Sequence, residues 1–190
     1  MTHHYAFLIW NLFLAWVPIV IVNYLINRRN IKGIKLILTF ITWLLFLPNA
    51  PYLITDLLHF RHTANMTAWF DVLLLSAFAI SGLLFGLVAL FRMQQILNSR
   101  IGKKQADILI FFSAVLSGFG IYLGRFERYN SWDVISNPFS LAFDIIRLCI
   151  TARSVGVTLG FGLLFYLAYF FIKSHFKSNT YGNTHSNTGI

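Results

Sequence analysis

Long runs of apolar residues, each close to 20 residues in length, limit the folds open to this sequence more than any other feature. Five such runs lie at about 5–26, 34–52, 70–91, 108–124 and 154–172. A helix of about 20 residues crosses the roughly 30 Å hydrocarbon core of a bilayer, because each residue adds about 1.5 Å. Only 11% of the 190 residues are charged, against about 25% in soluble domains. The sequence therefore predicts an all-α, multi-pass membrane protein with five spans.

These spans are expected to form one transmembrane domain, 1–173. The remaining segment, 174–190, is rich in Asn, Ser, Thr and Gly, a composition typical of disordered polar tails. An alternative with six spans would place a short extra crossing within 132–151. That segment contains a proline and several charged residues, which disfavour a simple crossing.

Two segments outside the spans combine an apolar surface with one narrow line of polar side chains. The first, 52–60, follows Pro48-Asn49-Ala50-Pro51, where two prolines predict a break in the second helix. The second, 138–151, begins with a proline at a position suited to the first turn of a helix. Helices of this type lie at the membrane interface, so we expect one or two interfacial helices to cover the outer ends of the spans.

Basic residues are concentrated in the short connections between the spans. Ten of the fifteen Lys and Arg residues fall in 28–35, 92–104 and 173–177. Cytoplasmic loops carry such an excess, so we expect a protein of the cell (cytoplasmic) membrane with its N-terminus outside and its C-terminus inside. The formal net charge of +9 does not predict nucleic-acid binding, because the basic residues do not gather into one patch.

The two predicted sides of the membrane differ in the cations that they use. All six lysines fall on the cytoplasmic side. The outer side has only arginines, together with five of the six acidic residues: Arg61, Arg125, Arg128, Arg147, Arg153, Asp56, Asp71, Glu127, Asp133 and Asp144. The planar guanidinium group suits bidentate pairing with carboxylates and phosphates. We therefore predict a folded assembly of ion pairs at the outer surface.

Three pairs of glycines are spaced four residues apart within the predicted spans: Gly82 and Gly86, Gly120 and Gly124, and Gly156 and Gly160. Small residues at this spacing let two helix backbones approach closely in a membrane. We therefore expect three of the spans to have faces that make close contacts.

The polar line of the 52–60 segment contains the first candidate site residues. Tyr52, Asp56 and His59 lie at helical spacing on one face. Asp56 and His59 could form a catalytic acid–base pair, or bind a metal together with His62. The competing interpretation pairs Asp56 with an outer arginine. Spacings of three and six residues are weaker than the i, i+4 pair of zinc-binding helices, so the sequence predicts no metal site and no cofactor.

Arginines after the fourth span form a second group of candidates. Arg125 and Arg128 are one helical turn apart, so both could bind one anionic group such as a phosphate. Arg147 is a third candidate cation, and Asp56 and Asp133 are expected to hold the arginines in place. The competing interpretations are arginines that extend to phospholipid headgroups and a pair between Asp144 and Arg147.

Several motifs on the predicted outer side are similar to those of a known family. They are Trp43-Leu44-Leu45-Phe46-Leu47-Pro48-Asn49-Ala50-Pro51-Tyr52, Thr55-Asp56-Leu57-Leu58-His59, Trp69-Phe70-Asp71, Gly120-Ile121-Tyr122-Leu123-Gly124-Arg125, Asn130-Ser131-Trp132-Asp133 and Asn137-Pro138. With these motifs, the chain resembles the uncharacterised bacterial membrane family labelled domain of unknown function 1361. The resemblance implies a multi-pass membrane protein and no known activity.

Three functions are weighed on these features. The first is a non-enzymatic protein that binds an anionic lipid headgroup, an envelope precursor or a partner protein at its outer face. The second is a membrane-embedded enzyme that acts on a phosphate-bearing or lipid substrate at the outer leaflet, with Asp56 and His59 as acid–base partners. The third is a small transporter, which the lack of charged residues in the middle of the spans disfavours. The sequence predicts no particular oligomeric state.

Overall fold

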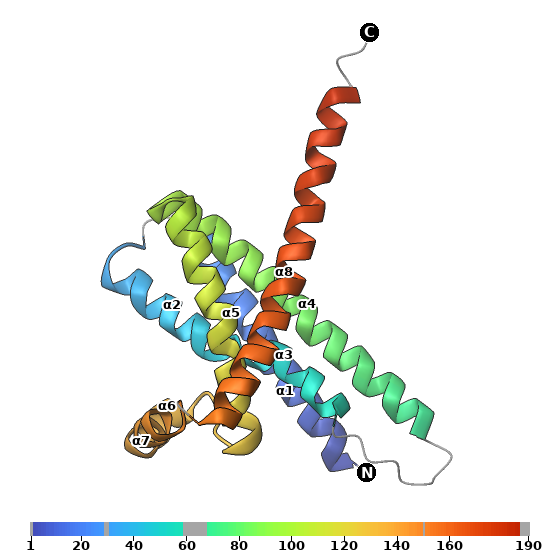
Figure 1. Cartoon of the computed structure of the whole chain (residues 1–190), viewed down its shortest axis with the longest axis vertical. Helices are drawn as coiled ribbons and strands as arrows, with labels where there is room; N and C mark the ends of the chain where they lie inside the picture. The colour runs from blue at the N-terminus through green and yellow to red at the C-terminus, as the bar shows by residue number, and fades with distance from the viewer. Residues whose placement is uncertain (1, 29–30, 59–67, 150, 187–190) are drawn as a thin grey trace.

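The computed structural model describes residues 2–28, 31–58, 68–149 and 151–186. In this part of the chain every regular element is a helix (Figure 1). The helices are α1 (Thr2–Asn27), α2 (Ile34–Phe46), α3 (Asn49–Leu58), α4 (Ala68–Ile101), α5 (Lys103–Phe126), α6 (Asp133–Ser136), α7 (Pro138–Leu148) and α8 (Ala152–Ser186).

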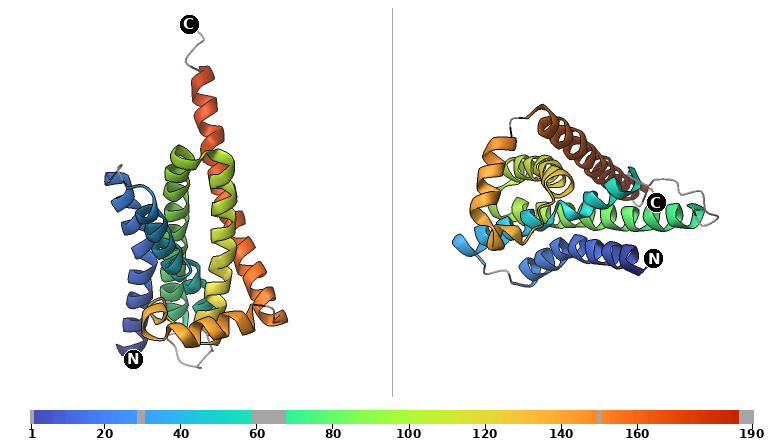
Figure 2. Two further views of the ribbon diagram at one scale, coloured as in Figure 1. Left: turned by 90° about the vertical axis from the view of Figure 1, so that its left-hand side faces the viewer. Right: turned by 90° about the horizontal axis from the view of Figure 1, so that it is seen from below.

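Five helical segments are long and apolar enough to cross a membrane: Ala6–Asn27, Ile34–Leu57, Trp69–Ile101, Lys103–Phe126 and Ala152–His175. The prediction of an all-α, multi-pass bundle is therefore confirmed. The segment expected as an alternative sixth crossing is not among these spans. It forms α6 and the 11-residue α7, which lie across the end of the bundle near the N-terminus (Figure 2). Eleven residues cover only about 16 Å.

At the other end of the chain, α8 continues to Ser186. This helix therefore extends into 174–190, for which the sequence predicts a disordered tail. The proposed boundary of the transmembrane domain at 173 stays a prediction. The chain begins and ends on opposite sides of the bundle (Figure 1), as an odd number of crossings requires.

The two prolines interrupt the second span without ending it. The backbone N–H of Leu47 still donates to the carbonyl of Trp43 at 3.0 Å, and that of Tyr52 donates to the carbonyl of Pro48 at 3.1 Å. Pro51 falls in the first turn of α3, where a helix has no carbonyl to receive its missing N–H group. For this reason α3 restarts at once, and the span runs from Ile34 to Leu57.

The expected interfacial position of 52–60 is wrong for its described residues. Helix α3 packs against α4, α1 and α5 inside the bundle, and Ala50, Leu53 and Thr55 are buried. Two glycines of α4 explain this position. A Cβ atom at Gly82 would lie 2.5 Å from Leu53 Cδ1, and one at Gly86 would lie 2.7 Å from Ala50 Cβ. The bare backbone of α4 therefore accommodates α3.

Helix α5 approaches the same break from its other side. A Cβ at Gly120 would lie 2.4 Å from Pro48 Cγ, and one at Gly124 would lie 3.3 Å from Tyr52 Cε2. Two of the three predicted glycine pairs therefore make close contacts, and both of them face the α2–α3 break.

The third predicted glycine pair does not make a close contact. A Cβ added at Gly156 or Gly160 would meet nothing within 4 Å. Helices α5 and α8 approach each other instead at Gly118, where a Cβ would lie 2.3 Å from the carbonyl oxygen of Thr158, and at Gly162. Spacing alone does not identify the glycines that face a neighbour, because the face is set by how α8 is rotated against α5.

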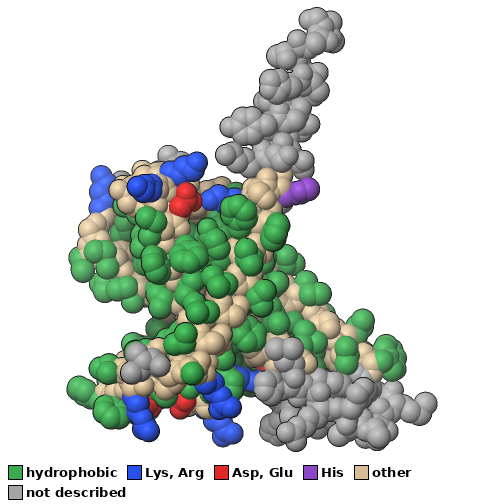
Figure 3. Space-filling view, viewed as in Figure 1, with side chains coloured by type: hydrophobic (Ala, Val, Ile, Leu, Met, Phe, Trp, Pro, Cys, Tyr) green, Lys and Arg blue, Asp and Glu red, His purple; other side chains and the backbone are tan. Residues whose placement is uncertain are grey.

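Charged side chains lie at the two ends of the bundle, with apolar side chains between them (Figure 3). One end, which we call the lysine end, contains the α1–α2 and α4–α5 connections. Its described lysines are Lys32, Lys35, Lys103, Lys104 and Lys173. The other, the arginine end, contains α6, α7 and the C-terminal end of α5. Its described arginines are Arg125, Arg128, Arg147 and Arg153.

A network of polar side chains links α4, α5 and α8 at the lysine end. Gln94 of α4 donates from Nε2 to Asp107 Oδ1 of α5 and accepts a hydrogen bond from the Tyr169 hydroxyl of α8. Lys173 of α8 completes the network, with its Nζ 3.1 Å from Asp107 Oδ1. Since Gln94 and Tyr169 are buried, these bonds satisfy groups that would otherwise be costly inside the bundle.

Candidate functional site

A cavity of about 370 Å³ lies at the arginine end, between α1, α2 and α5. The connection after α5 and the helices α6 and α7 complete its wall through Tyr129, Asn130, Ser131, Val134, Leu141 and Ile145. Ligand pockets commonly measure about 300–1,000 Å³, so the cavity has room for part of a small amphiphilic molecule.

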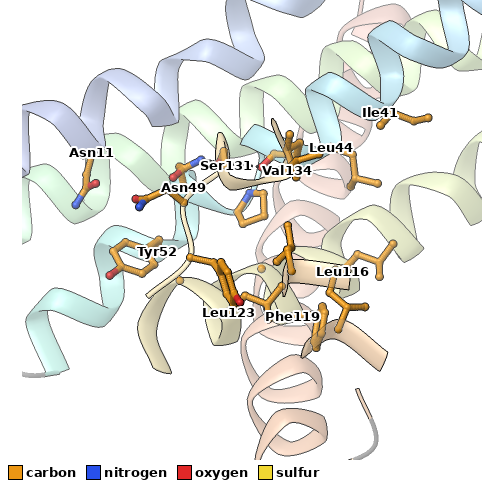
Figure 4. Close-up of a pocket in the computed structure, with 18 of the residues that line it drawn as sticks. Asn11, Ile41, Leu44, Asn49, Tyr52, Leu116, Phe119, Leu123, Ser131 and Val134 are labelled. Carbon is orange, nitrogen blue, oxygen red and sulfur yellow. Dashed lines mark hydrogen bonds between the residues drawn. The ribbon is translucent and has the colours of Figure 1, made fainter. Parts of the chain in front are cut away.

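Polar and apolar side chains line different sides of this cavity (Figure 4). Asn11, Asn49 and Tyr52 lie on one side, with Ser131 near the centre. The opposite side is apolar, with Ile41, Leu44, Leu116 and Phe119. Leu116 precedes Arg125 by nine residues, a distance of about 13 Å along a helix. The apolar side therefore lies deeper in the span, and the polar side is nearer the arginine end.

Asn11 provides a buried donor at the polar side. Asn11 is only 7% exposed, and its Nδ2 atom has no hydrogen-bond acceptor among the described residues. A buried donor left without a partner costs about 1–3 kcal/mol. Because Asn11 lines the cavity, an acceptor oxygen of a bound molecule could satisfy this amide.

Hydrogen bonds of Asn49 and Ser131 link the chain segment after α5 to the break in the second span. The backbone N–H of Ala50 donates to the carbonyl of Leu47 and so does not bond to the carbonyl of Phe46. The Phe46 carbonyl accepts a hydrogen bond from Asn49 Nδ2 at 2.9 Å. The same Nδ2 donates to Ser131 Oγ at 3.0 Å. Ser131 in turn donates to the carbonyl of Leu45 at 3.2 Å. The irregular backbone at the prolines thus creates the attachment point for this side of the cavity.

Directly behind the cavity wall, Arg125 forms an ion pair with Asp56. Arg125 Nη1 lies 2.8 Å from Asp56 Oδ1, and the two side chains are only 19% and 11% exposed. Nη2 also donates to the carbonyl of Thr55 at 3.4 Å. The guanidinium carbon is 5.9 Å from the centre of the Tyr52 ring, which lines the cavity. The competing interpretation, in which Asp56 pairs with one of the arginines at this end, is therefore confirmed.

Tyr129 joins the connection after α5 to α7. Its hydroxyl donates to Asp144 Oδ2 at 2.7 Å and lies 3.0 Å from Ser140 Oγ. The hydrogen bond to the Asp144 carboxylate raises the pKa of the Tyr129 hydroxyl above its usual value of 10.0. Asp144 is thus bonded to Tyr129, whereas the exposed Arg147 is not the partner of its carboxylate.

The predicted grouping of Arg125 with Arg128 on one helical turn is wrong. Helix α5 ends at Phe126, and Arg128 has a positive φ of 61°, so the chain leaves the helix before reaching it. A positive φ in a residue other than glycine is uncommon. The backbone N–H of Tyr129 then donates to the carbonyl of Leu123 at 3.1 Å, which closes the end of the helix.

Two further candidates have different surroundings from those expected. Asp133 does not hold an arginine, because its carboxylate accepts hydrogen bonds from the backbone N–H of Asn130 at 2.6 Å and from Ser136 Oγ at 2.9 Å. It stabilises the turn that begins α6 instead. His59 lies outside the described residues, so the proposed acid–base pair with Asp56 stays a prediction. Within the described ranges, no three His, Cys, Asp or Glu side chains form a group that could hold a metal ion.

Sequence reasoning did not select Asn11, Asn49, Tyr129 or Ser131 as site residues. The local signal is Asn11, one of two asparagines in a mostly apolar first span. The other three become recognisable only when α2, α5 and α7 are brought together.

Five long apolar helices, with an amphiphilic cavity at one end of the bundle, define the chain as a multi-pass membrane protein. The chain belongs to the family described as Protein of unknown function (DUF1361), whose model matches residues 10–168. That match includes every cavity residue except Phe7. No curated protein and no solved structure gives a significant match.

Proposed function

We propose that this protein binds a membrane lipid with an anionic headgroup at its arginine end and performs no chemical reaction on it. The lipid chain would lie against the apolar side of the cavity and the headgroup at the polar side. Since the lysine excess indicates the cytoplasmic end, the arginine end would face the outside of the cell membrane. An envelope precursor that carries a phosphate on a lipid chain has the same chemistry.

The arrangement of polar and apolar residues in the cavity carries this proposal. Ile41 and Leu116 are about half exposed on the surface of the bundle and also line the cavity, so the apolar side adjoins the surrounding lipid chains. At the other side, the unpartnered Nδ2 of Asn11 offers a donor to a phosphate or ester oxygen.

Positive charge lies close to that polar side. Arg125 lies over Tyr52, and Asp56 holds its guanidinium in place. The exposed Arg128 and Arg147 add cations at the same end.

The enzyme and transporter alternatives have no specific observation in their favour among the described residues. Asp56 is bonded to Arg125, so its carboxylate holds a guanidinium in place. A transporter would need polar groups through the span, whereas the deep side of this cavity ends on Leu116 and Ile41.

Native mass spectrometry of the protein extracted with its lipids tests this proposal. A Trp in place of Leu116 would fill the apolar side of the cavity. We expect Leu116→Trp to lose the lipid that co-purifies with the wild type. Leu109→Trp is the matched control, since this exposed leucine lies two turns earlier on the same face of α5 and does not line the cavity.

A complementary variant, Arg125→Ala, removes the buried cation behind the wall and should also reduce the retained lipid. If wild type, Leu116→Trp and Leu109→Trp retain the same lipids in the same amounts, the cavity is not a lipid site.

A further inference from the structure

A second cavity, of about 880 Å³, lies at the lysine end of the bundle. It is enclosed by the end of α1, the turn before α2 and the last turns of α4. Three cationic side chains line it, those of Lys32, Arg92 and Arg100, and no acidic residue of the described ranges does. Figure 3 shows basic side chains gathered at this end of the molecule.

Both arginines of this cleft are fixed by hydrogen bonds. Arg92 Nη1 donates to Asn23 Oδ1 of α1, and Arg100 Nη1 donates to the backbone carbonyl of Ile31. Each acceptor is a neutral oxygen atom, and these two bonds orient the guanidinium groups. The cations are therefore held in place before any ligand arrives, which lowers the entropy lost on binding.

The turn that positions Lys32 depends on Gly33. This glycine has a φ of +60°, a conformation that glycine adopts readily and other residues rarely do. The turn brings Lys32 to the cleft, opposite the end of α4. Three cations thus converge on one space from two separate parts of the chain.

We propose that this cleft binds a phosphate group attached to an apolar or glycerol-based molecule. Arginine and lysine side chains are the usual phosphate ligands of proteins. Leu25, Leu36 and Ile96 form an apolar part of the same wall. The phosphate could belong to an anionic phospholipid of the adjoining leaflet or to a soluble phosphate ester.

Basic residues also accumulate at this end simply because they set the orientation of the protein in the membrane. That general role and a built site predict different effects of mutation. If the basic residues act only through their total charge, replacing any two of them should have the same effect on binding. If the cleft is a site, Arg92 and Arg100 matter, whereas Lys103 and Lys104, which are exposed and do not line the cleft, do not.

The first arm of the test uses the full chain in nanodiscs of equimolar phosphatidylglycerol and phosphatidylcholine. Native mass spectrometry measures how much phosphatidylglycerol each variant retains after extraction. We expect the double variant Arg92→Gln and Arg100→Gln to bind it about 100-fold more weakly, or about tenfold for each arginine, equivalent to about 1.4 kcal/mol each. The double variant Lys103→Gln and Lys104→Gln should match the wild type.

The second arm separates the two sources of phosphate. Isothermal titration calorimetry measures binding of glycerol phosphate and inorganic phosphate to protein purified in detergent with phosphatidylcholine only. Binding that disappears in the double arginine variant, without a preference for phosphatidylglycerol, would identify a soluble ester as the ligand. A phosphatidylglycerol preference without calorimetric binding would identify the lipid.

A single-site comparison covers the case in which the double arginine variant does not fold. Lys32 and Lys35 are both exposed and three residues apart, but only Lys32 lines the cleft. Lys32→Gln should weaken binding about tenfold, and Lys35→Gln should not. Equal losses in cleft and control variants, or no loss in either, would overturn the proposal. None of these substitutions touches the arginine-end cavity, so this test is independent of the lipid binding proposed there.

Discussion

Replacing Arg125 with Met removes the guanidinium bonded to Asp56 and leaves a carboxylate whose side chain is only 11% exposed. Methionine keeps most of the length of the arginine stem, so the packing against Tyr52 changes little. The main effect of Arg125→Met is therefore the loss of the 2.8 Å ion pair. Asp56→Leu is the reciprocal change and leaves the guanidinium of Arg125 without this carboxylate.

The size of the effect follows from the burial of the pair. Exposed ion pairs contribute about 0–1 kcal/mol, and breaking a fully buried pair costs about 3–5 kcal/mol. With side chains 19% and 11% exposed, this pair lies between the two cases and nearer the second. We expect each single variant to lower the free energy of unfolding by about 2–3 kcal/mol. The double variant should lose less than the sum of the two single variants, because it leaves no buried charge.

A double-mutant cycle measures this directly, with unfolding followed by circular dichroism in mixtures of SDS and mild detergent. The coupling energy between residues in contact is commonly about 0.5–3 kcal/mol, and we expect a value in the upper half of that range. Arg147→Met is the matched control, since this arginine is exposed on α7. Additive effects, or single variants indistinguishable from Arg147→Met, would refute the assignment of a structural role to the pair.

Four other substitutions have definite expected outcomes. Gly120→Ala places a methyl group into a close helix contact and should lower the free energy of unfolding by about 1–3 kcal/mol. Gly156→Ala, whose added methyl group meets open space, should be neutral or stabilising in the same unfolding assay. Asn11→Leu should raise the stability of lipid-free protein by about 1 kcal/mol, because it removes an unsatisfied donor, while reducing lipid retention in mass spectrometry. Because the pKa of Tyr129 is raised in the folded protein, its hydrogen bonds stabilise the fold below pH about 10, and this stabilisation is lost as the pH rises through the folded pKa. In an ultraviolet titration, the wild type should contain a tyrosine that ionises at higher pH than usual, and Tyr129→Phe should lack it.

The positions of the spans could be predicted from the sequence because the bilayer imposes a minimum length of apolar helix. The pairing of Asp56 with an arginine could be anticipated for a related reason. All described cations at the arginine end are arginines, while the lysines occupy the other end, and this difference is visible in the sequence alone.

The position of α3 could not be predicted in the same way. Its polar line resembles that of an interfacial helix, and nothing local indicates that Gly82 and Gly86 of α4 leave space for it. The end of α5 presents a similar difficulty. Arg128 adopts a conformation that its residue type does not signal, so helical spacing does not hold as far as Arg128, two residues beyond the end of α5.

The cavity itself depends on contacts between distant parts of the chain. Asn49 and Ser131 are 82 residues apart, and neither residue suggests a site in isolation. The packing of the helices determines which polar residues line the same cavity. That packing cannot be read directly from one sequence.

The attachment between Asn49 and Ser131 has a consequence for how the cavity is reached. The side formed by the connection after α5 is fastened to the proline break by side-chain hydrogen bonds, not by the backbone ladder of a span. Each such bond contributes about 0.5–1.5 kcal/mol, whereas moving a whole span would disrupt the packing of several helices. If the cavity binds a lipid as proposed, widening its mouth at this corner would disturb less structure than moving a span.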